Sequence, residues 1–153
     1  RVLVEADGSA AAPVHRGWLL SVCGARNRAH YLKDFVLLEN SIRFMIFPPY
    51  VDLRDQLRVD KAFLEEKGYE DVAQMTLPKN LTKMAYKRLA RMVGVIRRAA
   101  QKVGGKAFSF DEYLAAQFLM LYGLMKFPEY HKPAALRALG MIGGRVAKTK
   151  YAD

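Results

Sequence analysis

The sequence predicts one all-α domain, a compact irregular bundle of about four to six helices. Apolar residues recur every three or four positions in several long stretches, and strand-like alternation is almost absent. With 153 residues, 52% hydrophobic and 26% charged, the chain has the composition and length of a single folded domain. We expect residues 1–153 to form one helical domain, with an extended N-terminal arm at 1–25 and a basic tail at 145–153.

The first expected helix lies between Arg26 and Phe47, and Pro48-Pro49 ends it. Its apolar residues recur at helical spacing and should form one buried face. They are Tyr31, Phe35, Leu38, Ile42 and Met45.

The next stretch is shorter and acidic. Asp60 is placed to cap a short helix through Leu64, and Gly68 is placed to end it. Tyr69 to Met75 should add one or two further helical turns before Leu77-Pro78.

The strongest helical pattern covers residues 81–103, with Asn80 or Thr82 as the N-cap. Its expected buried stripe is Leu81, Ala85, Leu89, Met92, Ile96, Ala99 and Val103. Basic residues fall on the opposite face, so this helix should be amphipathic.

Gly104-Gly105 should break that helix, and Ser109 with Glu112 is a capping-box pattern for the next one. The helix from there to about Phe127 is apolar almost all round and should be the buried centre of the domain. Pro128 should end it. Pro133 suits the first turn of a final helix, which Gly143-Gly144 should end before the basic residues Arg145, Lys148 and Lys150.

Positive charge is concentrated in one segment. The net charge is +10, and residues 79–106 carry nine bases and no acid, whereas residues 52–75 carry seven acids. Several uncompensated cations cannot be buried together, so this block should lie in water, contact the acidic segment, or face an anionic partner. A helix made only for water usually mixes charges of both signs, which favours the partner. The candidate partner-binding residues are Lys83, Lys87, Arg88, Arg91, Arg98 and Lys102.

No catalytic, cofactor or metal site is expected. His15, His30 and His131 are far apart in sequence and more typical of surface or capping groups, and the single Cys23 excludes a disulfide within the chain. Gly104-Gly105-Lys106 follows a helix instead of a strand, unlike a phosphate-binding loop. The longest uncharged apolar stretch, 113–125, is shorter than the roughly 20 residues of a membrane-spanning helix.

The chain begins at Arg1 and continues into a run of small residues from Asp7 to Pro13. This beginning fits a mature protein that has lost an organelle-targeting leader. An incomplete start or an expression fusion would look the same.

A series of short segments points to a known family by its order and spacing. They are Leu57-Arg58-Val59-Asp60, Glu65-Glu66, Asp71-Val72-Ala73, Leu77-Pro78-Lys79-Asn80-Leu81, Ala85-Tyr86-Lys87-Arg88-Leu89-Ala90-Arg91 and Asp111-Glu112-Tyr113-Leu114-Ala115-Ala116-Gln117. This order, over residues 57–125, resembles the small matrix-side subunit 7 family of the mitochondrial cytochrome bc1 complex (complex III).

The resemblance implies an all-α, cofactor-free supernumerary subunit that is not an enzyme. Such a subunit would lie peripherally on the matrix side of the mitochondrial inner membrane, brace cytochrome b and support assembly of the respiratory-chain complex. Its partners would be cytochrome b and the core subunits, with anionic lipid headgroups as a further candidate.

The alternative is an organellar ribosomal protein that binds rRNA through the basic helix, since a pI near 9.8 with clustered cations is also typical of RNA binding. A DNA partner is not expected. An enzyme would need a site assembled from residues distant in sequence. Salt separates the two main hypotheses, because affinity for RNA falls steeply with salt whereas an apolar subunit contact does not.

Overall fold

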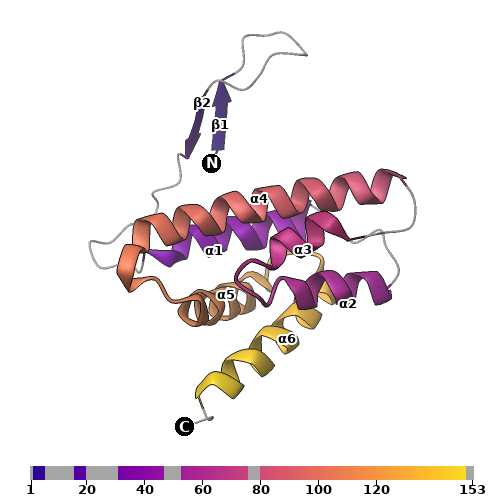
Figure 1. The fold of residues 1–153 in the computed structure, drawn as a ribbon. Helices are drawn as coiled ribbons and strands as arrows, with labels where there is room; N and C mark the ends of the chain where they lie inside the picture. Colours follow the sequence, from indigo (N-terminus) through magenta and orange to yellow (C-terminus); the bar gives the residue numbers. More distant parts are fainter. Residues whose placement is uncertain (1, 6–15, 20–30, 47–52, 76–79, 151–153) are drawn as a thin grey trace.

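The computed structural model describes residues 2–5, 16–19, 31–46, 53–75 and 80–150; for 2–5, 16–19, 80–83 and 149–150 it describes the backbone alone. Six α-helices occur in these residues, which confirms the predicted all-α class. They are α1 (Leu32–Ser41), α2 (Leu53–Ala62), α3 (Gly68–Gln74), α4 (Asn80–Gly104), α5 (Phe110–Leu124) and α6 (Lys132–Lys150) (Figure 1).

One feature of the expected N-terminal arm was not predicted. Strands β1 (Val2–Glu5) and β2 (Arg16–Leu19) pair antiparallel, with Val2 opposite Leu19. Each strand has four residues, which is too short for a clear alternating pattern in the sequence.

Helix α1 is the central element, packed against α4 on one side and against α5 on the other (Figure 1). Its buried residues are Leu32, Val36, Glu39 and Asn40. The predicted face was therefore wrong in part: Phe35 and Leu38 are only partly buried, and Met45 is 46% exposed. Because α4 and α5 cover α1 from two sides, the buried residues of α1 are not confined to its apolar face. They include the polar residues Glu39 and Asn40.

The chain continues from α1 into a π-helical segment, Ile42–Ile46. The predicted helix end at Pro48-Pro49 lies outside the described residues. Ile42 enters a core cluster with α2, α3 and α4, whereas Phe44 enters a second cluster with α5 and α6. Arg43, between them, is buried. This segment therefore connects the two halves of the core.

Helices α2 and α3 correct two predictions. Asp60 does not cap a helix; it lies in the last turn of α2 and binds arginine side chains. Gly68 begins α3 instead of ending a helix, and a Cβ there would overlap the carbonyl oxygen of Ala62. The helix predicted over Tyr69–Met75 is confirmed as α3.

The break after α4 is confirmed. Gly105 has φ +53°, a backbone conformation that favours glycine, and the Ser109 hydroxyl accepts a 3.4 Å hydrogen bond from the Glu112 N–H at the start of α5. Helix α5 is not buried all round, since Leu119 is 68% and Tyr122 71% exposed. It packs against α1 and α6, and its remaining side faces outward.

Helix α6 contains Pro133 in its first turn, as predicted, but Gly143-Gly144 do not end it. The helix continues to Lys150, so Arg145 and Lys148 are helical. Two glycines cost a helix only about 1 kcal/mol each, and the Phe118 ring lies 3.2 Å from where a Cβ of Gly143 would be. The absence of a side chain at Gly143 therefore lets α5 pack closely against α6.

Candidate docking surface

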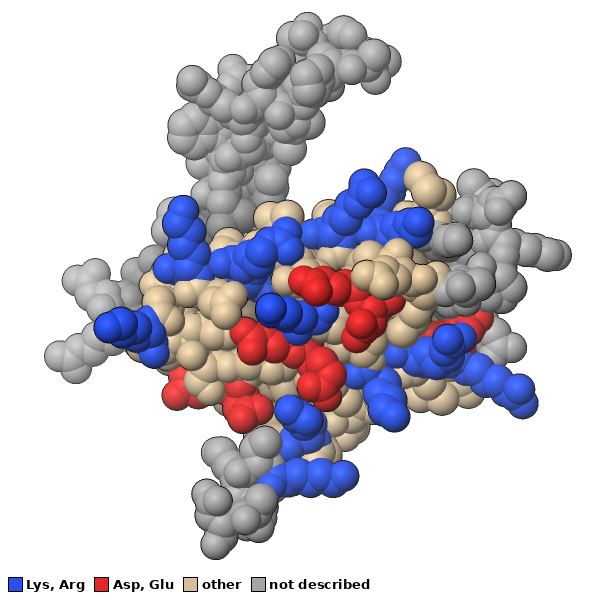
Figure 2. Space-filling model, in the orientation of Figure 1, with Lys and Arg blue, Asp and Glu red and all other residues tan. Residues whose placement is uncertain are grey.

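The side of α4 that faces away from the core carries most of the predicted partner-binding residues. We call this side the outer face of α4; it consists of Met84, Lys87, Arg88, Arg91, Met92, Val95, Arg98, Lys102 and Val103. Figure 2 shows a band of Lys and Arg along the edge formed by α4, with Asp and Glu on the surface below it.

The structure brings together five of the six predicted residues. Arg88, Arg91, Arg98 and Lys102 are exposed, and Lys87 is half-buried at the edge. The side chain of Lys83 lies outside the described residues. The cations share one helix face because Arg91 lies three or four positions after Arg88 and Lys87, and Arg98 and Lys102 follow at steps of seven and four, which match the helical repeat.

The five cations lack an ion pair within the described part of the chain. None of Lys87, Arg88, Arg91, Arg98 and Lys102 lies within ion-pair distance of an acid there. Helix α4 contains no Asp or Glu in its 25 residues, so the outer face is an uncompensated positive surface. Such a surface attracts anionic groups.

Large apolar side chains lie among the cations. Met84 is 54%, Met92 38%, Val95 60% and Val103 63% exposed. The predicted buried stripe was therefore wrong for Met92 and Val103, although Leu89 and Ile96 are buried as expected. The buried side of α4 is rotated towards Val93, Arg97 and Ala100.

Arg97 is buried, unlike the other described cations of the basic segment, and its side chain points inward. Its side chain is 3% exposed, and its Nη2 and Nε donate to the two carboxylate oxygens of Glu39 at 2.9 and 3.1 Å. Its remaining donors reach the carbonyl oxygens of Phe63 and Glu65, both at 2.8 Å. Because every nitrogen is satisfied, the guanidinium fixes which side of α4 faces the core.

Glu39 is the centre of a longer series of buried charges. Arg43 Nη1 donates to Glu39 Oε1 at 3.3 Å, and Arg43 Nη2 donates to Asp60 at 3.2 Å. Asp60 also accepts from Arg137 Nε at 2.8 Å. We call Arg97, Glu39, Arg43, Asp60 and Arg137 the buried ionic chain. It connects α4, α1, the π-helical segment, α2 and α6.

The surroundings of Glu39 keep it ionised. Burial by itself would raise the pKa of this carboxyl, but the charges of Arg97 and Arg43 and hydrogen bonds from Arg97 and Tyr113 outweigh burial and lower it to about 2. Burial first, and then the Glu39 charge, raise the pKa of the Tyr113 hydroxyl, which donates to Glu39 at 2.8 Å. Tyr113 therefore stays a neutral donor.

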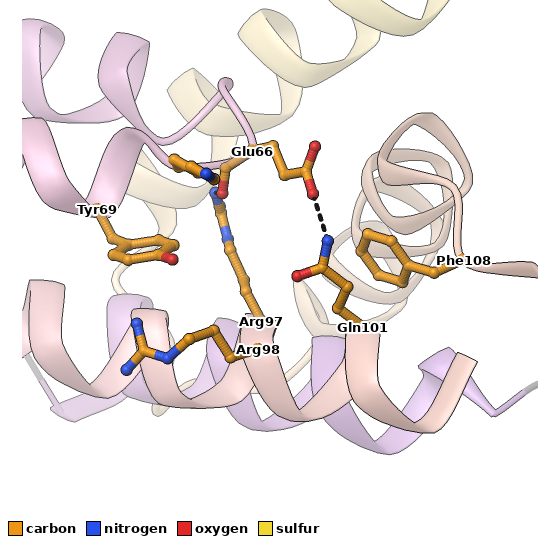
Figure 3. A pocket seen from close by; sticks show the side chains of 7 residues that line it. Glu66, Tyr69, Arg97, Arg98, Gln101 and Phe108 are labelled. Atoms are coloured by element: carbon orange, nitrogen blue, oxygen red, sulfur yellow. Dashed lines mark hydrogen bonds between the residues drawn. The ribbon is translucent and has the colours of Figure 1, made fainter. Parts of the chain in front are cut away.

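One small pocket opens beside the outer face (Figure 3). Tyr69, Arg97, Arg98, Gln101 and Glu66 are among its lining residues, and the Arg98 guanidinium lies 5.4 Å from the Tyr69 ring centre. Gln101 donates to Glu66 at 2.9 Å. The pocket's volume of about 20 Å³ is room for about one water molecule.

Gly94 allows α3 to approach α4 at this pocket. A Cβ at Gly94 would lie 2.8 Å from the Tyr69 ring, closer than real Cβ contacts. The glycine thus lets the Tyr69 ring lie flat on α4, where Arg98 stacks on it.

One of the three histidines has a structural role. His131 caps α6, because its Nδ1 accepts from the Ala134 N–H at 3.3 Å.

The described residues contain no group of three or more His, Cys, Asp or Glu side chains suited to a metal ion. In the same residues, no helix has both the length and the apolar character to cross a membrane. Cys23, His15 and His30 lie outside the described residues.

The buried ionic chain is the feature that sequence reasoning missed. Its signal was Glu39, an acid that directly follows the apolar run from Phe35 to Leu38. Comparison with known protein families, curated proteins and solved structures finds no match to this chain.

Proposed function

We propose that this chain is a non-catalytic accessory subunit that docks through the outer face of α4 onto an anionic surface of a larger assembly. The observation that carries the proposal is the outer face of α4. It combines cations that form no ion pair among the described residues with exposed apolar side chains, on a helix whose orientation Arg97 fixes. A surface of this kind is costly for an isolated chain and favourable in a complex.

The assembly we propose is the cytochrome bc1 complex of the respiratory chain, because the order of segments over residues 57–125 resembles its subunit 7 family. The chain would then brace cytochrome b and contact the core subunits on the matrix side of the mitochondrial inner membrane. Exposed apolar residues on other helices, such as Leu119, Tyr122 and Leu136, offer further contact area.

Purification of the tagged chain from its own cells, in mild detergent, tests this proposal. We expect it to elute with haem-containing membrane protein. Because cations make part of the contact, a raised salt concentration should weaken the attachment, and the apolar side chains should limit the loss. Elution with ribosomal RNA and without haem would support the ribosomal alternative and contradict the proposal.

A further inference from the structure

The outer face of α4 has two properties that a purely electrostatic site does not need. Met84, Met92, Val95 and Val103 are exposed along the whole length of the helix, and the cations lie between them. A partner that offers phosphate charge alone, such as an RNA backbone, leaves these apolar side chains in water. The described part of this face also lacks an aromatic side chain on which a base could stack.

The arrangement also differs from an ordinary protein interface. The centre of a protein interface is depleted of charge, and its charged residues lie at the rim. Here Arg91, Val95 and Lys102 lie close to one line along the middle of the exposed side, since residues 91, 95 and 102 are separated by four and seven positions. Charge and apolar surface are therefore mixed at the centre.

We propose that the outer face of α4 binds the headgroup region of an anionic lipid bilayer. At a membrane surface, Lys and Arg side chains reach the lipid phosphates while short apolar side chains enter between the headgroups, so mixing of the two kinds is favourable there. The inference deepens the proposed docking function, on which it rests, by naming the partner.

The shape and rigidity of the helix fit a planar partner. Helix α4 has 25 residues and runs along one side of the helical bundle (Figure 1). At 1.5 Å per residue the helix is about 37 Å long. The bonds of Arg97 to Glu39 on the inner side prevent the helix from rotating its apolar residues inward.

Vesicle sedimentation with the full chain tests the inference. We expect binding to vesicles of equal parts phosphatidylcholine and phosphatidylserine, and little binding to phosphatidylcholine alone. The Arg88→Gln/Arg91→Gln/Lys102→Gln variant should bind roughly a hundredfold more weakly, because each cation near the surface contributes about a factor of five. The Met84→Ser/Val95→Ser variant should bind roughly tenfold more weakly at unchanged charge.

Matched controls separate a binding face from net charge. Lys61→Gln/Lys126→Gln/Lys148→Gln removes the same charge from exposed residues of other elements, and Leu53→Ser/Leu57→Ser removes two exposed apolar side chains from α2. Both controls should retain most of the binding. Equal losses in the control and outer-face variants would overturn the inference.

Two further results would also overturn it. The first is absence of binding of the unaltered chain to the anionic vesicles. The second is tight binding to structured RNA that Met84→Ser/Val95→Ser does not change. Failure of the docking function itself is distinct, since that is read from co-purification with the haem complex and not from vesicles.

Discussion

Arg97 of α4 and Glu39 of α1 form a two-point ion pair in the interior, with N–O distances of 2.9 and 3.1 Å. The two side chains are 58 positions apart in sequence and at most 3% exposed. The pair holds one cation of the basic segment inward, and the neighbouring Arg98 is thereby placed at the surface. The Arg97–Glu39 pair thus determines which cations of α4 lie inside and which lie at the surface.

Breaking this pair should destabilise the fold strongly. Arg97→Met removes the ion pair of Glu39 and the hydrogen bonds to the carbonyl oxygens of Phe63 and Glu65. A buried carboxylate is then left without this partner, so we expect the free energy of unfolding to fall by about 3–5 kcal/mol. Urea unfolding measures it. Glu39→Gln/Arg97→Met should cost clearly less than the sum of the two single variants. Additive costs would mean that the pair is not coupled.

Stability should depend on pH through Glu39. Its pKa is about 2 in the folded protein, against an ordinary value of 4.5. Because the folded pKa is the lower one, this stabilisation is complete above about pH 4.5 and is lost as the pH falls towards 2, by about 3 kcal/mol in all.

The variant Glu39→Gln isolates this contribution. The difference in unfolding free energy between the unaltered chain and the variant should be constant above about pH 5 and shrink below it. Urea unfolding at several pH values gives this difference. A difference that does not change between pH 5 and pH 3 would assign the acid sensitivity to other carboxyls.

Gly94 should tolerate no side chain. In Gly94→Ala the new Cβ meets the Tyr69 ring at 2.8 Å, so α3 or the ring must shift, at a cost of about 1–3 kcal/mol. Gly140→Ala is the control, since its Cβ meets nothing within 4 Å and alanine favours a helix, so it should stabilise by about 0.5–1 kcal/mol. Thermal unfolding of both variants gives the comparison; a stabilised Gly94→Ala would contradict the close approach.

The two sides of α5 should respond differently to charge. Leu121 is fully buried, so Leu121→Asp should cost about 4 kcal/mol or more and abolish folding in a marginally stable chain. Leu119→Asp, at a residue 68% exposed, should stay within about 1 kcal/mol of the unaltered chain. Circular dichroism and solubility distinguish them. A folded, soluble Leu121→Asp variant would place the core elsewhere.

The sequence predicted those elements whose signals are local. Regular apolar spacing located α4, the glycine pair marked its end, and Ser109 with Glu112 marked the start of α5. Prediction failed where a distant partner decides. Asp60 was predicted as a helix cap, but it binds Arg43 and Arg137, which are remote from it in sequence. Gly143-Gly144 was predicted to end α6, but Phe118 of α5 packs against Gly143 within the helix.

The candidate surface was predicted with similar limits. Helical spacing placed Arg88, Arg91, Arg98 and Lys102 on one exposed face. The exact rotation of α4 could not follow from hydrophobicity, because a buried Arg97 is stable only with Glu39 opposite it. For that reason Met92 and Val103 were expected inside and are found outside.

The most direct test is attachment of a charge-reversed chain to the haem-containing complex proposed above. We expect Arg88→Glu/Arg91→Glu/Lys102→Glu to fold normally, judged by circular dichroism, but to be recovered without haem on purification from cells, where the unaltered chain is expected to be recovered with it. The control variant Lys61→Glu/Lys126→Glu/Lys148→Glu carries the same change of charge on other elements. Haem absorbance should still be found in its purified fraction. Equal haem recovery with both variants would contradict a docking role for the outer face of α4.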